Sequence, residues 1–250
     1  MVVDADADLA LIKVKPKGLS LRPLPLGSDS GLRVGDPVAA IGSPFGEPQS
    51  LSVGVISALD RTIESLTDFS IPGAIQTDAA INRGNSGGPL VDAGRRVIGI
   101  NARIETTGGG GEGVGFAIPI DAAKRSFKEL RDHGDVDYAY LGITTVPVFP
   151  QLARKFDLGT DQGAWIQRVN AGSPASDAGL RAGDRTEEFQ FQDYRVGGDV
   201  IVELDGKPIR AESDVGRIVF GKRPGDEVNA VVIRDGEKQT VKIKLGERPD

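Results

Sequence analysis

Between residues 9 and 118, short apolar stretches alternate with turns rich in Gly, Pro and Asp, and no helical pattern lies between them. Short strands separated by turns at such regular intervals are typical of antiparallel β-barrels and sandwiches. The pattern therefore predicts a mainly β domain in the first half of the chain. Its expected strands are Leu9–Val14, Asp36–Ile41, Val53–Ala58, Ile75–Thr77, Leu90–Val91, Val97–Asn101 and Gly115–Ile118.

A helical pattern follows this β-rich segment. Ala123, Phe127 and Leu130 recur at steps of three and four residues, which places them on one face of a helix. We expect the helix to span Ala122–His133, with Asp121 as its N-cap. A glycine directly after it is a stop signal, so we divide the chain there into domains of residues 1–134 and 135–250.

The second domain has a mixed pattern of strands and short helices. Leu180–Asp184 is half-repeated by Arg195–Asp199, and we interpret the intervening Arg185–Tyr194 as an insertion between a short helix and a strand. The expected strands are Leu141–Thr144, Ala164–Val169, Val200–Leu204, Glu227–Arg234 and Lys238–Leu245. The expected helices are Ala175–Ala178 and Glu212–Val219.

Composition excludes several kinds of function. The net charge is −6 at pH 7 with both signs mixed along the chain, whereas a nucleic-acid surface needs clustered positive charge. We therefore expect no nucleic-acid partner. The chain has no cysteine and a single histidine, His133, which excludes disulfides, thiolate metal sites and a histidine-rich zinc site. Hydroxyl, carboxylate, amine or backbone groups must carry any chemistry.

The strongest functional signal is Gly84–Leu90 (GNSGGPL), which follows Gln76–Ala80 (QTDAA). Ser86 lies between glycines on an expected tight turn, so its hydroxyl can point outward while nearby backbone N–H groups converge. An exposed nucleophile and backbone donors for an oxyanion are the two requirements of acyl transfer. The purely structural alternative is a Gly-rich β-turn, in which the same residues are ordinary.

The run Gln76–Leu90 closely resembles the nucleophile segment of HtrA/Deg serine proteases. Four further segments are similar to this family in the same order: Leu32–Asp36, Ile41–Gly46, Val53–Ser57 and Gly115–Pro119. The resemblance implies a trypsin-like antiparallel β-barrel protease domain, with its first barrel incomplete in this chain, followed by a PDZ domain. It implies no metal or organic cofactor.

By this resemblance Ser86 is the nucleophile, and the N–H groups of Gly84 and Ser86 form the oxyanion hole. Asp8 opens the segment DLALIK, which is similar to the family's catalytic-aspartate strand. An aspartate there orients the imidazole of a histidine base. The family's histidine lies upstream of that aspartate, so we expect it to lie outside this chain. We interpret His133 as an exposed residue at a helix end.

The resemblance also places the primary specificity pocket of the protease, whose floor lies six residues before the nucleophile. The pocket residues that it implies are Ala80, Ile81, Ile100, Asn101 and Ala102. A small apolar floor without a carboxylate predicts a preference for aliphatic P1 residues over Lys or Arg.

Four residues resemble the carboxylate-binding loop of protease-associated PDZ domains: Tyr140, Leu141, Gly142 and Ile143. The resemblance implies that a peptide C-terminus adds a strand to a sheet edge while backbone N–H groups of this loop hold its carboxylate. We expect the peptide groove between the strand at Gly163–Val169 and the helix at Glu212–Val219.

Together these features imply a serine endopeptidase that degrades unfolded or misfolded proteins, with a PDZ domain that binds peptide C-termini. The resemblance further implies trimer-based homo-oligomers where the family's N-terminal segment is present, and an extracytoplasmic or organellar location. The alternative is a catalytically inactive fragment or pseudoprotease that acts as a peptide-binding PDZ module. An upstream histidine codon would favour the protease, and a true start at Met1 would favour the alternative.

Overall fold

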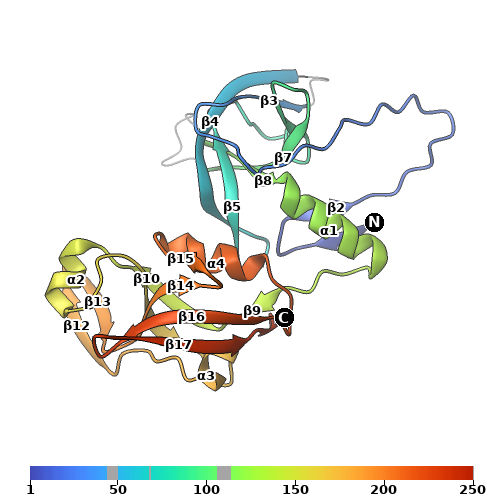
Figure 1. The fold of residues 1–250 in the computed structure, drawn as a ribbon. Helices are drawn as coiled ribbons and strands as arrows, with labels where there is room; N and C mark the ends of the chain where they lie inside the picture. Colours follow the sequence, from blue (N-terminus) through green and yellow to red (C-terminus); the bar gives the residue numbers. More distant parts are fainter. Residues whose placement is uncertain (44–49, 68, 106–113, 250) are drawn as a thin grey trace. The chain divides into compact units, whose positions relative to one another are not determined.

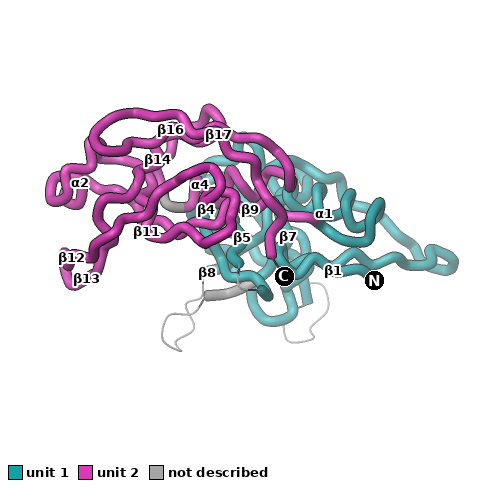
Figure 2. The backbone as a smooth tube through the Cα atoms, turned by 90° about the horizontal axis from the view of Figure 1, so that it is seen from below, with its two compact units in different colours: residues 1–136 teal, residues 137–250 magenta. Residues whose placement is uncertain are grey.

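The β-rich first half folds into a closed barrel in the computed structural model, which describes residues 1–43, 50–67, 69–105 and 114–249. The chain divides into two compact units, residues 1–136 and 137–250, drawn in teal and magenta in Figure 2. Residues 44–46, which end the expected Ile41–Gly46 motif, lie outside the described residues.

Six antiparallel strands close the barrel of the first unit in the order β3-β4-β5-β8-β7-β6. Figure 1 labels β3, β4, β5, β7 and β8 of this barrel. Their bounds are β3 (Pro37–Gly42), β4 (Ser50–Glu64), β5 (Ser70–Thr77), β6 (Pro89–Asp92), β7 (Val97–Glu105) and β8 (Val114–Pro119). Alternate side chains point inward along each strand, and β-branched and small residues such as Val38, Ile56, Ile75 and Ala117 fill the interior. The predicted mainly β, trypsin-like barrel is confirmed.

A short hairpin precedes the barrel and is joined to it by residues 12–36. It consists of β1 (Val2–Asp4) and β2 (Leu9–Leu11). The hairpin packs on α1 (Ile120–Asp132), where the buried carboxylate of Asp4 accepts hydrogen bonds from Ser126 Oγ at 2.5 Å and Ala7 N–H at 3.1 Å. Asp4 therefore anchors the hairpin to the helix.

Helix α1 begins earlier than predicted, at Ile120 instead of Ala122. Pro119 is its N-cap residue, so the predicted cap Asp121 lies in the first turn. Proline has no N–H and a fixed φ near −65°, which suits the residue where a strand ends and a helix begins. The helix ends at Asp132, and His133 follows as the C-cap.

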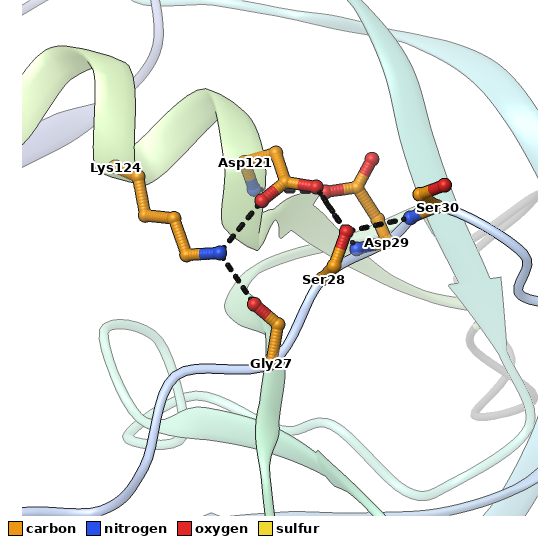
Figure 3. Close-up of polar contacts among 6 residues, drawn as sticks. All are labelled: Gly27, Ser28, Asp29, Ser30, Asp121 and Lys124. Atoms are coloured by element: carbon orange, nitrogen blue, oxygen red, sulfur yellow. Dashed lines mark hydrogen bonds and ion pairs between the residues drawn. The ribbon is translucent and has the colours of Figure 1, made fainter.

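The carboxylate of Asp121 ties the connecting segment to the helix (Figure 3). It accepts hydrogen bonds from Ser28 Oγ at 2.6 Å and Lys124 Nζ at 2.8 Å, and Lys124 Nζ also donates to Gly27 O. Asp29 Oδ1 accepts from the Asp121 N–H at 2.8 Å. Partial burial raises the pKa of Asp121, but the hydrogen bonds from Lys124, Ser28 and Asp29 outweigh it and lower the pKa to about 2. Burial is the main cause that raises the pKa of Asp29.

The second unit is built on a sheet of order β10-β11-β14-β16-β17, with β15 paired to β14. The strands are β9 (Ala139–Tyr140), β10 (Ile143–Pro147), β11 (Ala164–Val169), β12 (Arg185–Phe189), β13 (Gln192–Val196), β14 (Val200–Leu204), β15 (Lys207–Pro208), β16 (Glu227–Arg234), β17 (Glu237–Lys244) and β18 (Gly246–Glu247). The helices are α2 (Pro150–Phe156), α3 (Pro174–Asp177) and α4 (Glu212–Phe220). Residues from the sheet and from α4, among them Ile166, Ile201, Val215 and Ile218, share one core.

The insertion predicted at Arg185–Tyr194 contains most of a two-stranded hairpin, β12–β13. Two of its three aromatic residues pack locally, because Phe189 and Tyr194 join Phe156 and Trp165 in a cluster with ring centroids 5.3–6.1 Å apart. Phe191, at the hairpin tip, is fully exposed. Within the described residues, no helix is both long and apolar enough to cross a membrane.

Candidate active site and peptide-binding loop

The turn that carries Ser86 is shaped by two glycines. Asn85 O accepts a hydrogen bond from Gly88 N–H at 2.9 Å, and Gly87 has a φ of +81°. This bond, with positive φ at the third residue, defines a type II turn, which favours glycine at that position. Gly88 has no room for a side chain, because a Cβ there would lie 2.1 Å from Ile41 O. Ser86 therefore occupies the second position of a tightly held turn.

The Ser86 hydroxyl is accessible, and two backbone donors lie beside it. Ser86 is exposed, and its Oγ donates to Ala102 O at 2.9 Å. Within the described residues, the N–H groups of Gly84 and Ser86 donate to no protein acceptor. An exposed hydroxyl next to uncommitted backbone N–H groups is the arrangement that acyl transfer needs.

Asn101 on β7 holds this turn from the side. Its N–H donates to Gly88 O and its C=O accepts from Gly87 N–H, both at 2.8 Å. Its side chain is buried, with 1% exposure. The side-chain Nδ2 lies 3.3–3.4 Å from three carbonyl oxygens, those of Ile41, Asn85 and Pro89. The side chain of Asn101, predicted as part of the pocket wall, thus faces the turn and not an open pocket.

The other predicted pocket residues lie around the same turn. Ala80 is exposed, Ile81 is buried, and Ile100 and Ala102 are half-buried. The N–H of Ala80 donates to Ser52 Oγ at 2.7 Å, so β4 fixes the backbone of the expected pocket floor. Ser52 was missed from the sequence, where one serine in an alternating strand gives no signal of this contact.

Asp8 is exposed, lies in the turn between β1 and β2 and has a φ of +52°. This turn contacts the one between β4 and β5, where Leu66 N–H donates to Ala5 O at 3.4 Å. No hydrogen bond between described residues joins Asp8 to Ser86. The structure therefore brings Ser86, Gly84 and the pocket residues together but does not link the predicted aspartate to them.

His133 is exposed and follows the last residue of α1, its N–H donating to Glu129 O at 2.7 Å. A helix of 13 residues is about 20 Å long, so α1 separates His133 from the barrel strand β8 by roughly that distance. Within the described part of the chain, Ser86 Oγ donates to a carbonyl, Ala102 O, and not to a base.

In the expected carboxylate-binding loop, two carbonyl groups accept hydrogen bonds from the segment of residues 170–175. Leu141 O accepts from Ala175 N–H at 3.0 Å, and Gly142 O accepts from Asn170 N–H at 2.9 Å. In a trans peptide the C=O and the following N–H point in opposite directions. The N–H groups of Gly142 and Ile143 therefore point away from the segment of residues 170–175.

Gly142 and Tyr140 in this loop are also held by residues 170–173. Gly142 has a φ of +82°, and a Cβ on it would lie 2.3 Å from the Cβ of Ser173, so the position admits only glycine without rearrangement. Tyr140 OH accepts from Asn170 Nδ2 at 2.6 Å. A cavity of about 810 Å³, bounded by Tyr140, Asn170 and Lys242 among others, borders residues 170–174, the side to which the carbonyl groups point. The loop's N–H groups therefore do not face that cavity.

The predicted position of the peptide groove is wrong by one strand. Strand β11, the expected groove strand, is paired on both sides, with β10 and with β14. Strands β10 and β17 are the two edges of the sheet, and β10 is the edge that contacts α4. A peptide can add only to an unpaired edge, so a groove bordered by α4, as expected from the sequence, lies at β10 in this sheet.

Comparisons with known proteins agree with this architecture. Residues 1–100 match the family model of the trypsin-like peptidase domain, and residues 139–245 match that of the PDZ domain. The chain is 40% identical to a probable periplasmic serine endoprotease, DegP-like, of Halomonas elongata over 99% of its length, and 39% identical to one of Ectopseudomonas mendocina. It covers 48% of each, and so spans about half the length of these curated relatives.

Two solved structures are similar along nearly the whole chain. An HtrA-type protease, AlgW with a decapeptide, is 36% identical with a TM-score of 0.73, and the match covers 99% of this chain and 70% of that one. The serine endoprotease from Yersinia pestis is 30% identical with a TM-score of 0.62, covering 98% and 74%. By sequence, domain content and fold, the chain belongs to the HtrA/Deg family of trypsin-like, PDZ-containing serine proteases.

Proposed function

We propose that this chain is part of a serine endopeptidase of the HtrA/Deg type that cleaves unfolded or misfolded proteins. The observation that carries the proposal is the exposed Ser86 on a type II turn, beside the uncommitted N–H groups of Gly84 and Ser86. Such N–H groups stabilise the oxyanion of a tetrahedral intermediate.

In the proposed reaction, Ser86 Oγ attacks the scissile carbonyl carbon while a base takes the hydroxyl proton. The peptide C–N bond then breaks, and the base returns the proton to the leaving amine. Water hydrolyses the resulting ester by the same route. We assign the base to a histidine outside these 250 residues, with Asp8 as the acid that orients it.

The second unit is proposed to bind peptide C-termini between β10 and α4. The peptide would pair with the free edge of β10, and its carboxylate would accept hydrogen bonds from the N–H groups of Gly142 and Ile143. The orientation of these N–H groups away from residues 170–175 supports the proposal. The similar solved structures of AlgW with a decapeptide and with a tripeptide support it too.

We extend the proposal to the location and assembly of the protein. The similar curated relatives are called periplasmic, which supports an extracytoplasmic location. Trimer-based homo-oligomers are proposed from family resemblance alone.

The protease proposal is tested by covalent labelling of the 250-residue chain with a fluorophosphonate, with and without added imidazole. Free imidazole can replace a missing histidine side chain, so we expect labelling that rises with imidazole and requires its neutral form. Loss of the histidine alone costs about 10⁶ in kcat in subtilisin, so unassisted labelling should be very slow. Ser86→Ala should remove the imidazole-dependent part.

Two outcomes would contradict the protease proposal. Labelling that persists in Ser86→Ala would show that another hydroxyl reacts. An absence of imidazole-dependent labelling would favour the peptide-binding module without catalysis.

The peptide-binding proposal is tested by calorimetric titration with apolar C-terminal peptides, as free acids and as C-terminal amides. The free acid should bind at least ten times more tightly than the amide. Equal affinities would contradict carboxylate recognition by the loop.

A further inference from the structure

Asn101 makes more contacts with the nucleophile turn than a residue of a pocket wall would need. We propose that Asn101 is a positioning residue that aims the Ser86 N–H at the oxyanion. This inference deepens the proposed function and rests on it in one respect, that the group which accepts from the Ser86 N–H is an oxyanion. The direction of the N–H itself is a property of the fold.

The peptide between Asn85 and Ser86 sets the direction of the Ser86 N–H. Its carbonyl oxygen accepts from Gly88 N–H at 2.9 Å and lies 3.4 Å from Asn101 Nδ2. Because the peptide is trans, fixing this carbonyl inward fixes the Ser86 N–H outward. Rotation of this peptide would bury the N–H and lose a donor without changing the position of the Ser86 side chain greatly.

Asn101 also holds the peptides that follow Ser86 in the turn. The backbone of Asn101 accepts from Gly87 N–H and donates to Gly88 O, both at 2.8 Å. Its side-chain Nδ2 also lies within 3.4 Å of Ile41 O, at the end of β3, and of Pro89 O, at the start of β6. One buried residue of β7 thus holds the turn and both strands that flank it.

The side chain at position 101 has to be an amide, because it has to donate hydrogen bonds. Asn101 Oδ1 is buried without a hydrogen-bond partner within the described residues, which is unfavourable for stability. The reverse orientation of the amide would put this oxygen against three carbonyl oxygens, so the chemistry fixes which end faces the turn. An apolar residue would avoid the unpartnered oxygen. The amide is therefore explained by its two N–H donors, which lie against these carbonyl oxygens.

The test measures the direction of the Ser86 N–H bond in the 250-residue chain by two solution measurements. Residual dipolar coupling gives the line of the bond, referred to couplings from strands β3 to β8, and the nuclear Overhauser effect between the Ser86 amide proton and the Asn85 Hα gives its sense. In the wild type both should fit the outward orientation. In Asn101→Leu, which has the same branched shape and no donor, this orientation should be lost. Ser126→Ala, which removes a buried hydrogen bond to Asp4 elsewhere in the unit, is the matched control and should leave it unchanged.

Asn101→Asp keeps the test decisive if Asn101→Leu does not fold. A protonated carboxyl can donate one hydrogen bond, whereas an ionised one can only accept. The Ser86 N–H direction should therefore be close to wild type at acidic pH and should depart from it as the carboxyl ionises. The same direction in all folded Asn101 variants at all pH values would overturn the inference.

The imidazole-dependent labelling rate separates this inference from the proposed function. Loss of one oxyanion donor typically costs 10²–10³ in rate, and we expect a fall of that size in folded Asn101 variants. If the wild type is not labelled but the N–H direction depends on Asn101, the proposed function fails and the positioning role stands. If labelling proceeds and the Asn101 variants match the wild type, the inference is wrong and the proposed function stands.

Discussion

Removing the carboxylate of Asp199 should destabilise the second unit more than any change of a surface charge. Asp199 is 1% exposed and receives two hydrogen bonds from Arg234, from Nε to Oδ1 and from Nη2 to Oδ2, both at 2.7 Å. The N–H of Arg181 donates to its Oδ2 at 2.9 Å, and Arg234 Nη2 also reaches Gly179 O at 2.8 Å. The hydrogen bonds to Asp199 are the main cause that raises the pKa of Arg234.

The expected loss follows from the burial of both partners. Asp199→Ala would leave the guanidinium of Arg234, whose side chain is 14% exposed, without its counter-ion. Breaking a buried ion pair on one side typically costs about 3–5 kcal/mol, a large part of the roughly 5–15 kcal/mol of a typical domain. With a urea m-value of about 2 kcal/mol/M, the midpoint should fall by about 2 M.

The assay is urea unfolding followed by tryptophan fluorescence. Trp165 is the single tryptophan of the chain and is fully buried in the second unit, so its emission reports that unit alone. Its Nε1 donates to Gly198 O at 3.2 Å, next to the substituted residue. Far-UV circular dichroism of the same samples reports both units together, so a transition seen there and not in the fluorescence belongs to the first unit and serves as an internal reference.

Two further variants make this result interpretable. Lys242→Ala breaks an ion pair with Glu227 in which both side chains are more than half exposed, and should cost less than about 1 kcal/mol. Adding Arg234→Leu to Asp199→Ala removes the uncompensated charge and should recover more than half of the loss. A loss below about 1 kcal/mol in Asp199→Ala, or no recovery in the double variant, would refute the reasoning.

Three other changes have expected outcomes. Gln190 and Phe191 both have positive φ in the two-residue hairpin loop, so replacing the pair by Asn-Gly should raise the free energy of unfolding by about 1 kcal/mol in the same fluorescence assay; a loss would contradict the strain. Gly142→Ala, whose Cβ would lie 2.3 Å from that of Ser173, should weaken binding of a C-terminal peptide at least tenfold in calorimetry, and unchanged affinity would contradict the role of the loop. The pKa of Asp121, about 2 in the fold against an ordinary 3.8, means that its contribution is present above pH 4 and is lost as the pH falls towards 2. Asp121→Asn should flatten the stability of the first unit over that range in urea unfolding at several pH values, and an unchanged slope would contradict it.

The strands and the long helix were largely predictable because their signals are local. The alternation in β16 and the three- and four-residue steps of α1 are visible in any short window of sequence. Strand pairing is not local, which is why the groove was expected at β11 when β10 is the edge. The β12–β13 hairpin was missed as a hairpin because Gln190-Phe191 lacks the Asn or Gly that marks such turns. Helix α2 was missed because it is short, although the proline at its start and Arg154 and Lys155 in its last turn are helix signals.

The candidate active site was predictable only in part. The glycines around Ser86 predict a turn, and the position of the serine within this turn follows from the spacing of the glycines. The direction of the Asn101 side chain does not follow from sequence, because alternation along β7 distinguishes two faces but not which groups a buried amide meets. The place of Asp8 relative to Ser86 depends on how a short hairpin packs on a helix, which no local pattern encodes.

The two candidate sites orient backbone donors by the same physical means. At Ser86 and at Gly142, the carbonyl of the preceding residue is held by a hydrogen bond, and the planar trans peptide then sets the N–H direction. Glycine permits these turns, and further partners hold the carbonyls from elsewhere in the chain. The Leu141 carbonyl is held by Ala175 N–H, whereas the Asn85 carbonyl is held by Gly88 N–H within the turn and also by Asn101 Nδ2 from β7. Function at both sites should therefore be sensitive to substitutions in these supporting segments, including ones that touch neither substrate nor peptide. The loops alone do not determine where their N–H groups point.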